Sequence, residues 1–371
     1  PSAHAEEFEN LKSDDLASMN LASLLNVEIT VASLTGESLR ESPGIVTVLT
    51  RNDVLASGAR DFIDLLRLLP GFFFGVDVMG TVGVGMRGMW GHEGKIALFI
   101  DGQEMNELDY ATLQFGRHYT VDDIERIEVI RGPGSAIYGG FAELAVIKVT
   151  TLSGSKQGAS VSARYGGAPF GKSRSVFART GLVVGDLTLS LSANMGEGHR
   201  SDREYQELYG DNDPYSMDGN SDIETQMVNV GISYGNLTAR FIYDGYSFDN
   251  KDGFDVSTTN AITTGFGGMY AELAYELELS ETMTLTPKFN FKEQQPWNVP
   301  DYTAEEVVDF GLYYDTVVDR TQGSLTLSWD ASEGLNLILG ATGYIDRGHA
   351  VTTESEDANA LNFYPDPENP G

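Results

Sequence analysis

The stretch I-E-R-I-E-V-I-R-G-P-G-S-A-I-Y-G, residues 124 to 139, decides how the rest of the chain is organised. It begins as an alternating strand, in which apolar β-branched residues such as Ile127 and Val129 are separated by charged ones. The strand must end at Gly132-Pro133-Gly134, because proline has no N–H for a ladder and glycine permits positive φ. The sequence therefore predicts a strand that stops abruptly at a rigid turn.

Several shorter motifs stand on either side of this stretch in a fixed order. They are T-V-L-T-R-N-D-V (47 to 54), D-L-L-R-L-L-P-G (64 to 71), M-R-G (86 to 88), L-F-I-D-G (98 to 102) and V-I-K-V-T-T (146 to 151). Together with the signature at 124 to 139, this series resembles the plug domain of TonB-dependent outer-membrane receptors. The resemblance covers residues 27 to 151 motif by motif, and the rest of the chain by pattern alone.

The length, composition and charge of the chain exclude several classes of protein. The 371 residues leave room for two domains, and the absence of cysteine excludes disulfides and thiolate metal sites. A formal charge of -31, from 24 basic and 55 acidic residues, argues against a nucleic-acid partner, which would need a basic surface. No apolar run is long enough for a transmembrane helix, whereas membrane-spanning strands need only about 9 to 11 residues.

Within the first 151 residues we expect short elements. Two helices follow Asn52-Asp53, the second with Asp61 as its N-cap, and Pro70-Gly71 ends it. A short buried strand is expected over residues 96 to 100, and it leads into a turn at Asp101-Gly102. Residues 72 to 94 and 103 to 119 are, by resemblance, the two apical loops of a plug.

After Thr151 the pattern changes to long segments with an apolar residue at every second position, which is typical of barrel strands with apolar side chains outward. Short turns alternate with long polar connections, and Pro287 indicates a bulge. We expect about nine strands, at 159–166, 173–184, 187–196, 223–235, 237–248, 267–279, 282–293, 305–329 and 335–347. With the resemblance above, we expect the fold class to be an α+β plug inside a transmembrane antiparallel β-barrel.

Nine strands are too few to enclose a plug of this size, because barrels that hold one have about 22. The barrel is therefore expected to be truncated, with this chain a fragment or a cleaved half. Ala3-His4-Ala5 matches the A-x-A pattern of a signal-peptidase site. We expect residues 1–26 to be a signal remnant and flexible leader, 27–151 the plug, and 158–371 the first part of the barrel.

The resemblance implies a transport function without enzymatic chemistry. A receptor of this family sits in the bacterial outer membrane, beside lipid and lipopolysaccharide, and takes up a scarce, bulky substrate with energy delivered by periplasmic TonB. A ferric siderophore is the first expectation, with cobalamin, haem or an oligosaccharide, or a sensing or adhesive role, as alternatives. The expected TonB-binding segment, which is equally consistent with an ordinary first plug strand, consists of Val27, Glu28, Ile29, Thr30, Val31 and Ala32.

Two further sets of residues are assigned by the resemblance. Substrate contacts are expected from aromatic and polar groups of the apical loops, some of which would instead pack against the barrel: Phe73, Phe74, Asp77, Met79, Trp90, Glu104, Asp109, Tyr110, Gln114, Arg117 and His118. Structural roles in the plug are expected for Arg87, Gly88, Asp101, Gly102, Arg131, Gly132, Pro133, Tyr138 and Gly139.

Signals for other chemistry are weak. Gly83-x-Gly85-x-x-Gly88 matches a dinucleotide fingerprint and would make the chain a soluble oxidoreductase, but Met89-Trp90-Gly91 cannot open the helix that this fingerprint needs. The five histidines lack metal-site spacing, so we expect no catalytic metal and no cofactor. Acidic loops at 201–222 and 249–255 carry oxygen ligands that suit calcium, without EF-hand spacing.

Overall fold

The computed structural model describes residues 28–29, 37–38, 45–77, 80–132, 138, 140–168, 171–206, 213–251, 261–299, 316–332 and 335–350. The elements before residue 152 are short. They are β1 (Glu28–Ile29), β2 (Glu37–Ser38), β3 (Val46–Thr50), α4 (Arg51–Ser57), α5 (Phe62–Arg67), β4 (Phe72–Val76), β5 (Val82–Met86), β6 (Met89–Trp90), β7 (Ile96–Ile100), β8 (Gln103–Glu104), β9 (Ile124–Arg131) and β10 (Ala145–Thr151).

A five-stranded sheet in the order β3-β9-β10-β7-β8 forms the centre of the plug. The signature strand is confirmed as β9, which pairs antiparallel with both β3 and β10, while β10 runs parallel to β7. Ile127 and Ile147 are fully buried in the main apolar cluster, beside Leu65 and Leu66 of α5. The alternation read from the sequence thus places one face of β9 in the core.

The two expected helices are confirmed, with caps that fix where each begins. In α4, Asp53 N–H donates to the Thr50 hydroxyl and the Asp53 carboxylate accepts from Thr50 N–H, which is a capping box. In α5, Asp61 is the N-cap, since its carboxylate accepts from Asp64 N–H at 2.9 Å. Gly58 ends α4 with φ 66°, a left-handed conformation that glycine adopts without strain.

The glycines of the dinucleotide-like motif lie in a hairpin. β5 turns at Arg87-Gly88 directly into β6, and no helix follows. A Cβ on Gly85 would come within 2.2 Å of the Phe73 ring, and one on Gly83 within 2.6 Å of His92. These glycines therefore make room for aromatic rings, and the dinucleotide interpretation is wrong because the helix that would receive the phosphates is missing.

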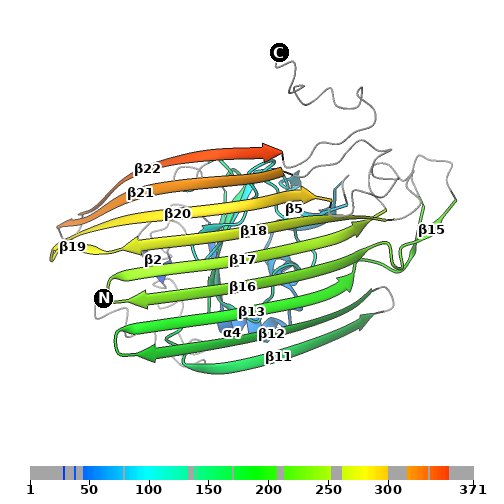
Figure 1. The fold of residues 1–371 in the computed structure, drawn as a ribbon, viewed down its shortest axis with the longest axis horizontal. Helices are drawn as coiled ribbons and strands as arrows, with labels where there is room; N and C mark the ends of the chain where they lie inside the picture. Colours follow the sequence, from blue (N-terminus) through cyan, green and yellow to red (C-terminus); the bar gives the residue numbers. More distant parts are fainter. Residues whose placement is uncertain are drawn as a thin grey trace, which may run out of the picture.

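Beyond the plug, the described residues form one antiparallel sheet with nine long strands, as expected from the alternating segments. Figure 1 shows this large sheet as a curved wall in front of the blue and cyan elements of the plug. Residues 305–315 of the eighth expected strand lie outside the described residues. The strands are β11 (Gly158–Ala168), β12 (Gly171–Val184), β13 (Leu187–His199), β16 (Asp222–Tyr234), β17 (Leu237–Asn250), β18 (Ile262–Tyr275), β20 (Met283–Asn298), β21 (Thr316–Ser332) and β22 (Leu335–Ala350), with β19 (Leu277–Ser280) beside β20 and a small hairpin of β14 (Glu204–Tyr205) and β15 (Tyr215–Ser216) in one long connection.

The prediction of a bulge at Pro287 is wrong. On one side Pro287 pairs in register with Leu325 of β21. On the other side pairing of β20 stops at Lys288 with β18 and resumes at Leu285 with β19, without a change of register. Because Pro287 has no N–H to donate, β18 and β19 are one strand interrupted by a missing ladder bond.

The large sheet has two chemically different faces. One side carries exposed apolar residues: Val161, Val176, Leu182, Leu191, Met195, Ile232, Phe241, Met269, Leu273, Phe289, Leu325, Trp329, Leu337 and Leu339. The other side carries buried polar groups such as Asn194, Asn229, Asp244 and Lys292, which face the plug. No helix in the described part of the chain combines the length and apolarity needed to cross a membrane.

Candidate functional site

The first apical segment presents an aromatic surface. Phe73 and Trp90 are each 37% exposed, with ring centroids 6.2 Å apart. Phe74 instead packs edge-on against buried Phe115, and the Arg67 guanidinium lies over its ring. Of the predicted contacts in this segment, Phe73 and Trp90 are therefore the accessible aromatic ones, while Met79 lies outside the described residues.

Asp77 is held inside its loop. Its carboxylate lies 3.0 Å from His92 Nε2 and accepts from Thr81 N–H at 2.8 Å. Burial alone raises the pKa of Asp77, but the hydrogen bonds from His92 and Thr81 outweigh it and hold the pKa below its usual range. Asp77 therefore fixes the β4–β5 loop as an ionised carboxylate.

In the second apical segment a buried carboxylate shapes the loop. Glu107 accepts from the backbone N–H groups of Asp109, Tyr110 and Thr112 at 2.6 to 3.0 Å. This turn leaves Asp109 and Tyr110 exposed, and the Tyr110 ring meets Trp297 of the large sheet edge-on at 6.4 Å. Asp109 and Tyr110 thus share with Phe73 and Trp90 the property of being open to a ligand.

Three other predicted contacts lie at the interface between plug and large sheet. His118 is 3% exposed, with Nδ1 2.8 Å from the Gln114 carbonyl oxygen and Nε2 2.8 Å from Asp244 Oδ1. Both ring nitrogens thus lie within hydrogen-bond distance of an oxygen, one from the plug and one from β17. Its ring stacks between Tyr119 and Tyr246, at centroid distances of 4.1 and 4.6 Å.

Gln114 is likewise buried, and Glu104 lies in a group of opposite charges. Its carboxylate is 3.8 Å from Lys292 Nζ and 3.9 Å from Arg320 Nη1. Lys292 also donates to the Asn106 carbonyl oxygen at 3.1 Å. Glu104 and His118 therefore join the plug to the large sheet, whereas the Gln114 amide donates to the Thr112 hydroxyl within the plug at 2.8 Å.

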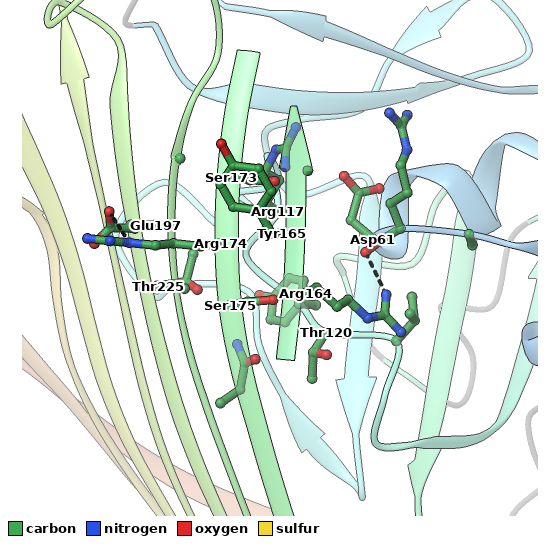
Figure 2. A pocket seen from close by; sticks show the side chains of 18 of the residues that line it. Asp61, Arg117, Thr120, Arg164, Tyr165, Ser173, Arg174, Ser175, Glu197 and Thr225 are labelled. Atoms are coloured by element: carbon green, nitrogen blue, oxygen red, sulfur yellow. Dashed lines mark hydrogen bonds and ion pairs between the residues drawn. The ribbon is translucent and has the colours of Figure 1, made fainter. Parts of the chain in front are cut away.

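A cavity of about 650 Å³ lies between the segment after α4 and the first three strands of the large sheet (Figure 2). Arg60, Asp61, Arg117 and Arg164 line it. Arg60 pairs with Asp64, and Arg164 pairs with Asp122 at 2.5 Å and donates to the Arg60 carbonyl oxygen. The cavity is thus lined by more positive than negative groups.

Arg117 lies in this cavity in a conformation that costs energy. Its φ of 68° falls in the left-handed region, which non-glycine residues adopt rarely and mostly where the surroundings enforce it. Burial raises the pKa of Asp61, and the charge of Arg117 acts against that rise. A guanidinium placed here can bind an anionic group that enters from the apical side.

Contacts that the sequence analysis missed fasten the plug to the large sheet. Asp101 Oδ2 accepts from Asn229 at 2.8 Å and lies 3.0 Å from Arg240 Nη1. Asp123 bonds Ser192, and burial raises its pKa to about 7. Asp122 and Asp123 directly precede the signature strand, and only their position before it could have singled them out.

The remaining predicted structural residues lie at turns and near the signature. Arg87 (φ 52°) donates to the Arg131 carbonyl oxygen at 3.4 Å, and Arg131 donates to the Thr47 hydroxyl at 3.0 Å. Tyr138 packs on Phe99 with centroids 5.1 Å apart, and burial raises its pKa. Gly88, Gly102 and Gly132 have positive φ, as has Asp101, while Pro133 and Gly139 lie outside the described residues.

The predicted TonB-binding segment is described only in part. Glu28 and Ile29 form β1 and pair antiparallel with β2. Val27, Thr30, Val31 and Ala32 lie outside the described residues. Among the described residues, no three histidine or acidic side chains are grouped to hold a metal ion.

Comparison with known proteins gives a consistent result. Residues 38–145 match the TonB-dependent Receptor Plug Domain. The Vitamin B12 transporter BtuB of Vibrio vulnificus is 32% identical over 133 residues, which are 34% of this chain and 21% of that protein. The iron-regulated outer membrane virulence protein of Vibrio cholerae is 30% identical over 128 residues, 32% of this chain and 19% of that protein.

Solved structures extend the likeness beyond the plug. A ferric enterobactin receptor from Pseudomonas aeruginosa superposes with a TM-score of 0.58 at 15% identity, over 82% of this chain and 49% of that one. The siderophore receptor PiuA from Acinetobacter baumannii gives 0.54 at 14%, over 84% and 47%. The likeness therefore covers about half the length of each solved receptor, and the sequence match about a fifth of each curated relative. This chain therefore carries a plug domain of the TonB-dependent receptor type at residues 38–145, and that domain lies against an antiparallel sheet that resembles the barrels of the solved receptors.

Proposed function

We propose that this chain provides the plug and part of the barrel of a receptor that takes up a scarce, bulky, anionic chelate across the outer membrane, with a ferric siderophore as the first substrate. The observation that carries the proposal is the asymmetry of the large sheet, which is apolar outside and polar where it holds the plug. An apolar outer face suits lipid, and the polar interior suits a solute path.

The substrate would meet two features of the described residues. Phe73, Trp90 and Tyr110 supply exposed aromatic faces, and the first cavity holds Arg117. Flat aromatic faces with one convergent cation suit a chelate whose rings carry negative charge. Lipopolysaccharide and other membrane lipid would surround the outer face.

We further propose residues 27–151 as the working plug unit, 158–371 as the barrel portion and 1–26 as the leader. Residues 27–32 would bind TonB by strand addition, in which affinity comes from main-chain hydrogen bonds. Substrate binding outside and TonB engagement inside would then act on the two ends of the same domain.

Uptake of labelled ferric siderophore by iron-starved cells that express the full-length protein tests this function. Ile29→Pro removes a strand donor and should abolish uptake while surface binding persists. Ile29→Ala keeps the N–H and is the matched control, so it should transport normally. Equal uptake by both variants would refute the assignment of the TonB segment.

Cobalamin is the second candidate substrate, because the matched transporter from Vibrio vulnificus is named for vitamin B12. The same cells, given labelled cobalamin in place of the siderophore, separate the two. If the cells take up labelled cobalamin and an excess of siderophore does not inhibit that uptake, cobalamin would replace the siderophore as the proposed substrate.

A further inference from the structure

A tight turn at residues 115–118 places Arg117 in the first cavity, the one of about 650 Å³. Two consecutive residues of this turn are left-handed, Gly116 with φ 88° and Arg117 with φ 68°. Glycine adopts this conformation freely, and a Cβ on Gly116 would lie only 3.0 Å from the Tyr246 hydroxyl oxygen. For an arginine the same conformation is strained, and it persists only where the surroundings over-determine it. Contacts around the turn must therefore hold Arg117 in place.

The plug core holds the two ends of this turn. Phe115 N–H donates to the Val82 carbonyl oxygen at 2.8 Å, and the Phe115 ring is buried. Tyr119, just after the turn, is buried too, and its ring meets that of Phe115 edge-on with centroids 6.1 Å apart. Because both ends are fixed close together, only residues 116–118 remain to reverse the chain. The conformation within the turn therefore depends on what these three residues contact.

His118 joins the turn to β17 of the large sheet. Its Nδ1 reaches back across the turn to lie 2.8 Å from the Gln114 carbonyl oxygen, and its Nε2 lies 2.8 Å from Asp244 Oδ1. Its ring also stacks on Tyr246, with centroids 4.6 Å apart. A rotation about φ of Arg117 moves His118 relative to Gln114, so relief of the strain would break at least one of these contacts. Together the three contacts outweigh the strain of one left-handed residue.

His118 and Asp244 act on the turn from outside the first cavity. The described residues that line the cavity include Arg117, Asp61 and Arg164 (Figure 2), and neither His118 nor Asp244 is among them. Both His118 and Asp244 are more than nine-tenths buried. An anion in the first cavity would therefore meet the Arg117 guanidinium without touching the two residues behind it.

We propose that His118 and Asp244 are positioning residues for Arg117, so that the first cavity binds an anionic group only while the plug is docked on β17. The proposal rests on the proposed function, because it takes an anionic chelate as the occupant of this cavity. It also gives that function a means of release, since Arg117 relaxes and the anion loses its partner once the plug moves away from β17. By linkage, a bound anion stabilises the contact between His118 and Asp244 by the same factor.

Binding of two matched ferric chelates to the full-length receptor in mild detergent tests this proposal. One is the anionic complex of a tripodal tricatechol, and the other is the uncharged complex of a tripodal trihydroxamate. His118→Gln should weaken binding of the anionic chelate about tenfold, as much as Arg117→Gln does, and leave binding of the uncharged one unchanged. The double variant R117Q/H118Q should bind as R117Q does, because a misplaced guanidinium and an absent one are equivalent for the anion.

Asn229→Ala is the matched control. Asn229 Nδ2 donates to Asp101 of the plug at 2.8 Å, so this variant removes another buried contact between plug and large sheet, one in which the turn takes no part. It should bind both chelates as the wild type does. An equal loss on N229A would show a general loosening of the plug and overturn the proposal, as would additive losses of about a hundredfold in R117Q/H118Q.

The outcomes separate this proposal from the proposed function. Binding of the anionic chelate that R117Q weakens and H118Q does not would refute the positioning role alone. Unchanged binding by R117Q would remove Arg117 from the site and refute the positioning role with it. If the wild type binds neither chelate, the proposed substrate class fails, and this proposal fails with it.

Two further measurements apply if H118Q does not assemble. Asp244→Ala removes the partner of His118 on β17 and makes the same test. Hydrogen exchange of the wild type decides independently, because a bound anion should hold the turn in place. The anionic chelate should slow exchange of the His118 amide more than the uncharged chelate does, and equal exchange with both would overturn the proposal.

Discussion

Replacing Asp123 by asparagine should remove a pH-dependent weakening of the contact between plug and large sheet. Asp123 is 7% exposed, and in the described part of the chain its Oδ1 has no hydrogen-bond partner. A cavity of about 30 Å³ lies beside it, enough for about one water. Burial, with help from the charge of Asp101, raises its pKa from 3.8 to about 7, against the hydrogen bond from Ser192.

The direction in which stability changes with pH follows from the pKa values of Asp123 in the unfolded and folded states. Between about pH 4 and pH 7 the folded protein keeps the Asp123 proton that the unfolded plug has released, so stability falls as pH rises and then levels off. The full difference is worth about 4 kcal/mol, and the part between about pH 5.5 and 7 about 2 kcal/mol. Asparagine keeps the shape and cannot ionise, so D123N should lack this slope.

Hydrogen exchange of β9 and β10 amides between pH 5.5 and 8.5, corrected for intrinsic rates, measures the effect. Protection in the wild type should fall relative to D123N by about 2 kcal/mol and then stay constant above about pH 7.5. Asp186→Asn, in an exposed turn, is the control and should follow the wild type. Parallel profiles for wild type and D123N would refute the reasoning.

Three further changes test separate contacts. Thr50→Ala removes the α4 capping box and should cost about 1 kcal/mol of local stability, seen as faster exchange confined to α4; unchanged exchange would contradict it. His118→Gln removes the ring nitrogen that lies 2.8 Å from the buried Asp244 carboxylate and should destabilise the plug by about 3 kcal/mol in urea, and adding Asp244→Asn should recover part of this; no recovery would argue against the pair. Arg117→Gln should weaken binding of an anionic chelate about tenfold, a loss of about 1.4 kcal/mol, with plug stability retained, whereas equal affinity would remove Arg117 from the site.

Local patterns predicted most of the elements. The alternation in residues 124–131, the Asp61 cap and the period-two segments after Thr151 each act between near neighbours in the chain, so they can be read without the fold. The prediction of a bulge at Pro287 was wrong because a missing N–H has two possible outcomes, a register shift or an unfilled position in the ladder. Only the neighbouring strand decides between them.

The candidate site was less predictable, because its contacts join residues that are far apart in the chain. His118 and Asp244 are 126 residues apart, and their pairing depends on how the plug docks against the large sheet. The sequence marks a histidine in a polar aromatic loop, which suits ligand binding and wall contact equally. Glu107 was missed because a carboxylate that orders its own loop has no distinguishing spacing.

The described strands of the plug and of the large sheet belong to separate ladders, and side chains such as Asp101, Glu104 and His118 join them. This has a mechanical consequence. Shearing a shared ladder would load many backbone bonds at once, whereas these pairs yield one after another and water replaces each partner. A pull from the N-terminal side would therefore meet a series of small resistances from side-chain pairs and no backbone ladder that the described strands of the two sheets share.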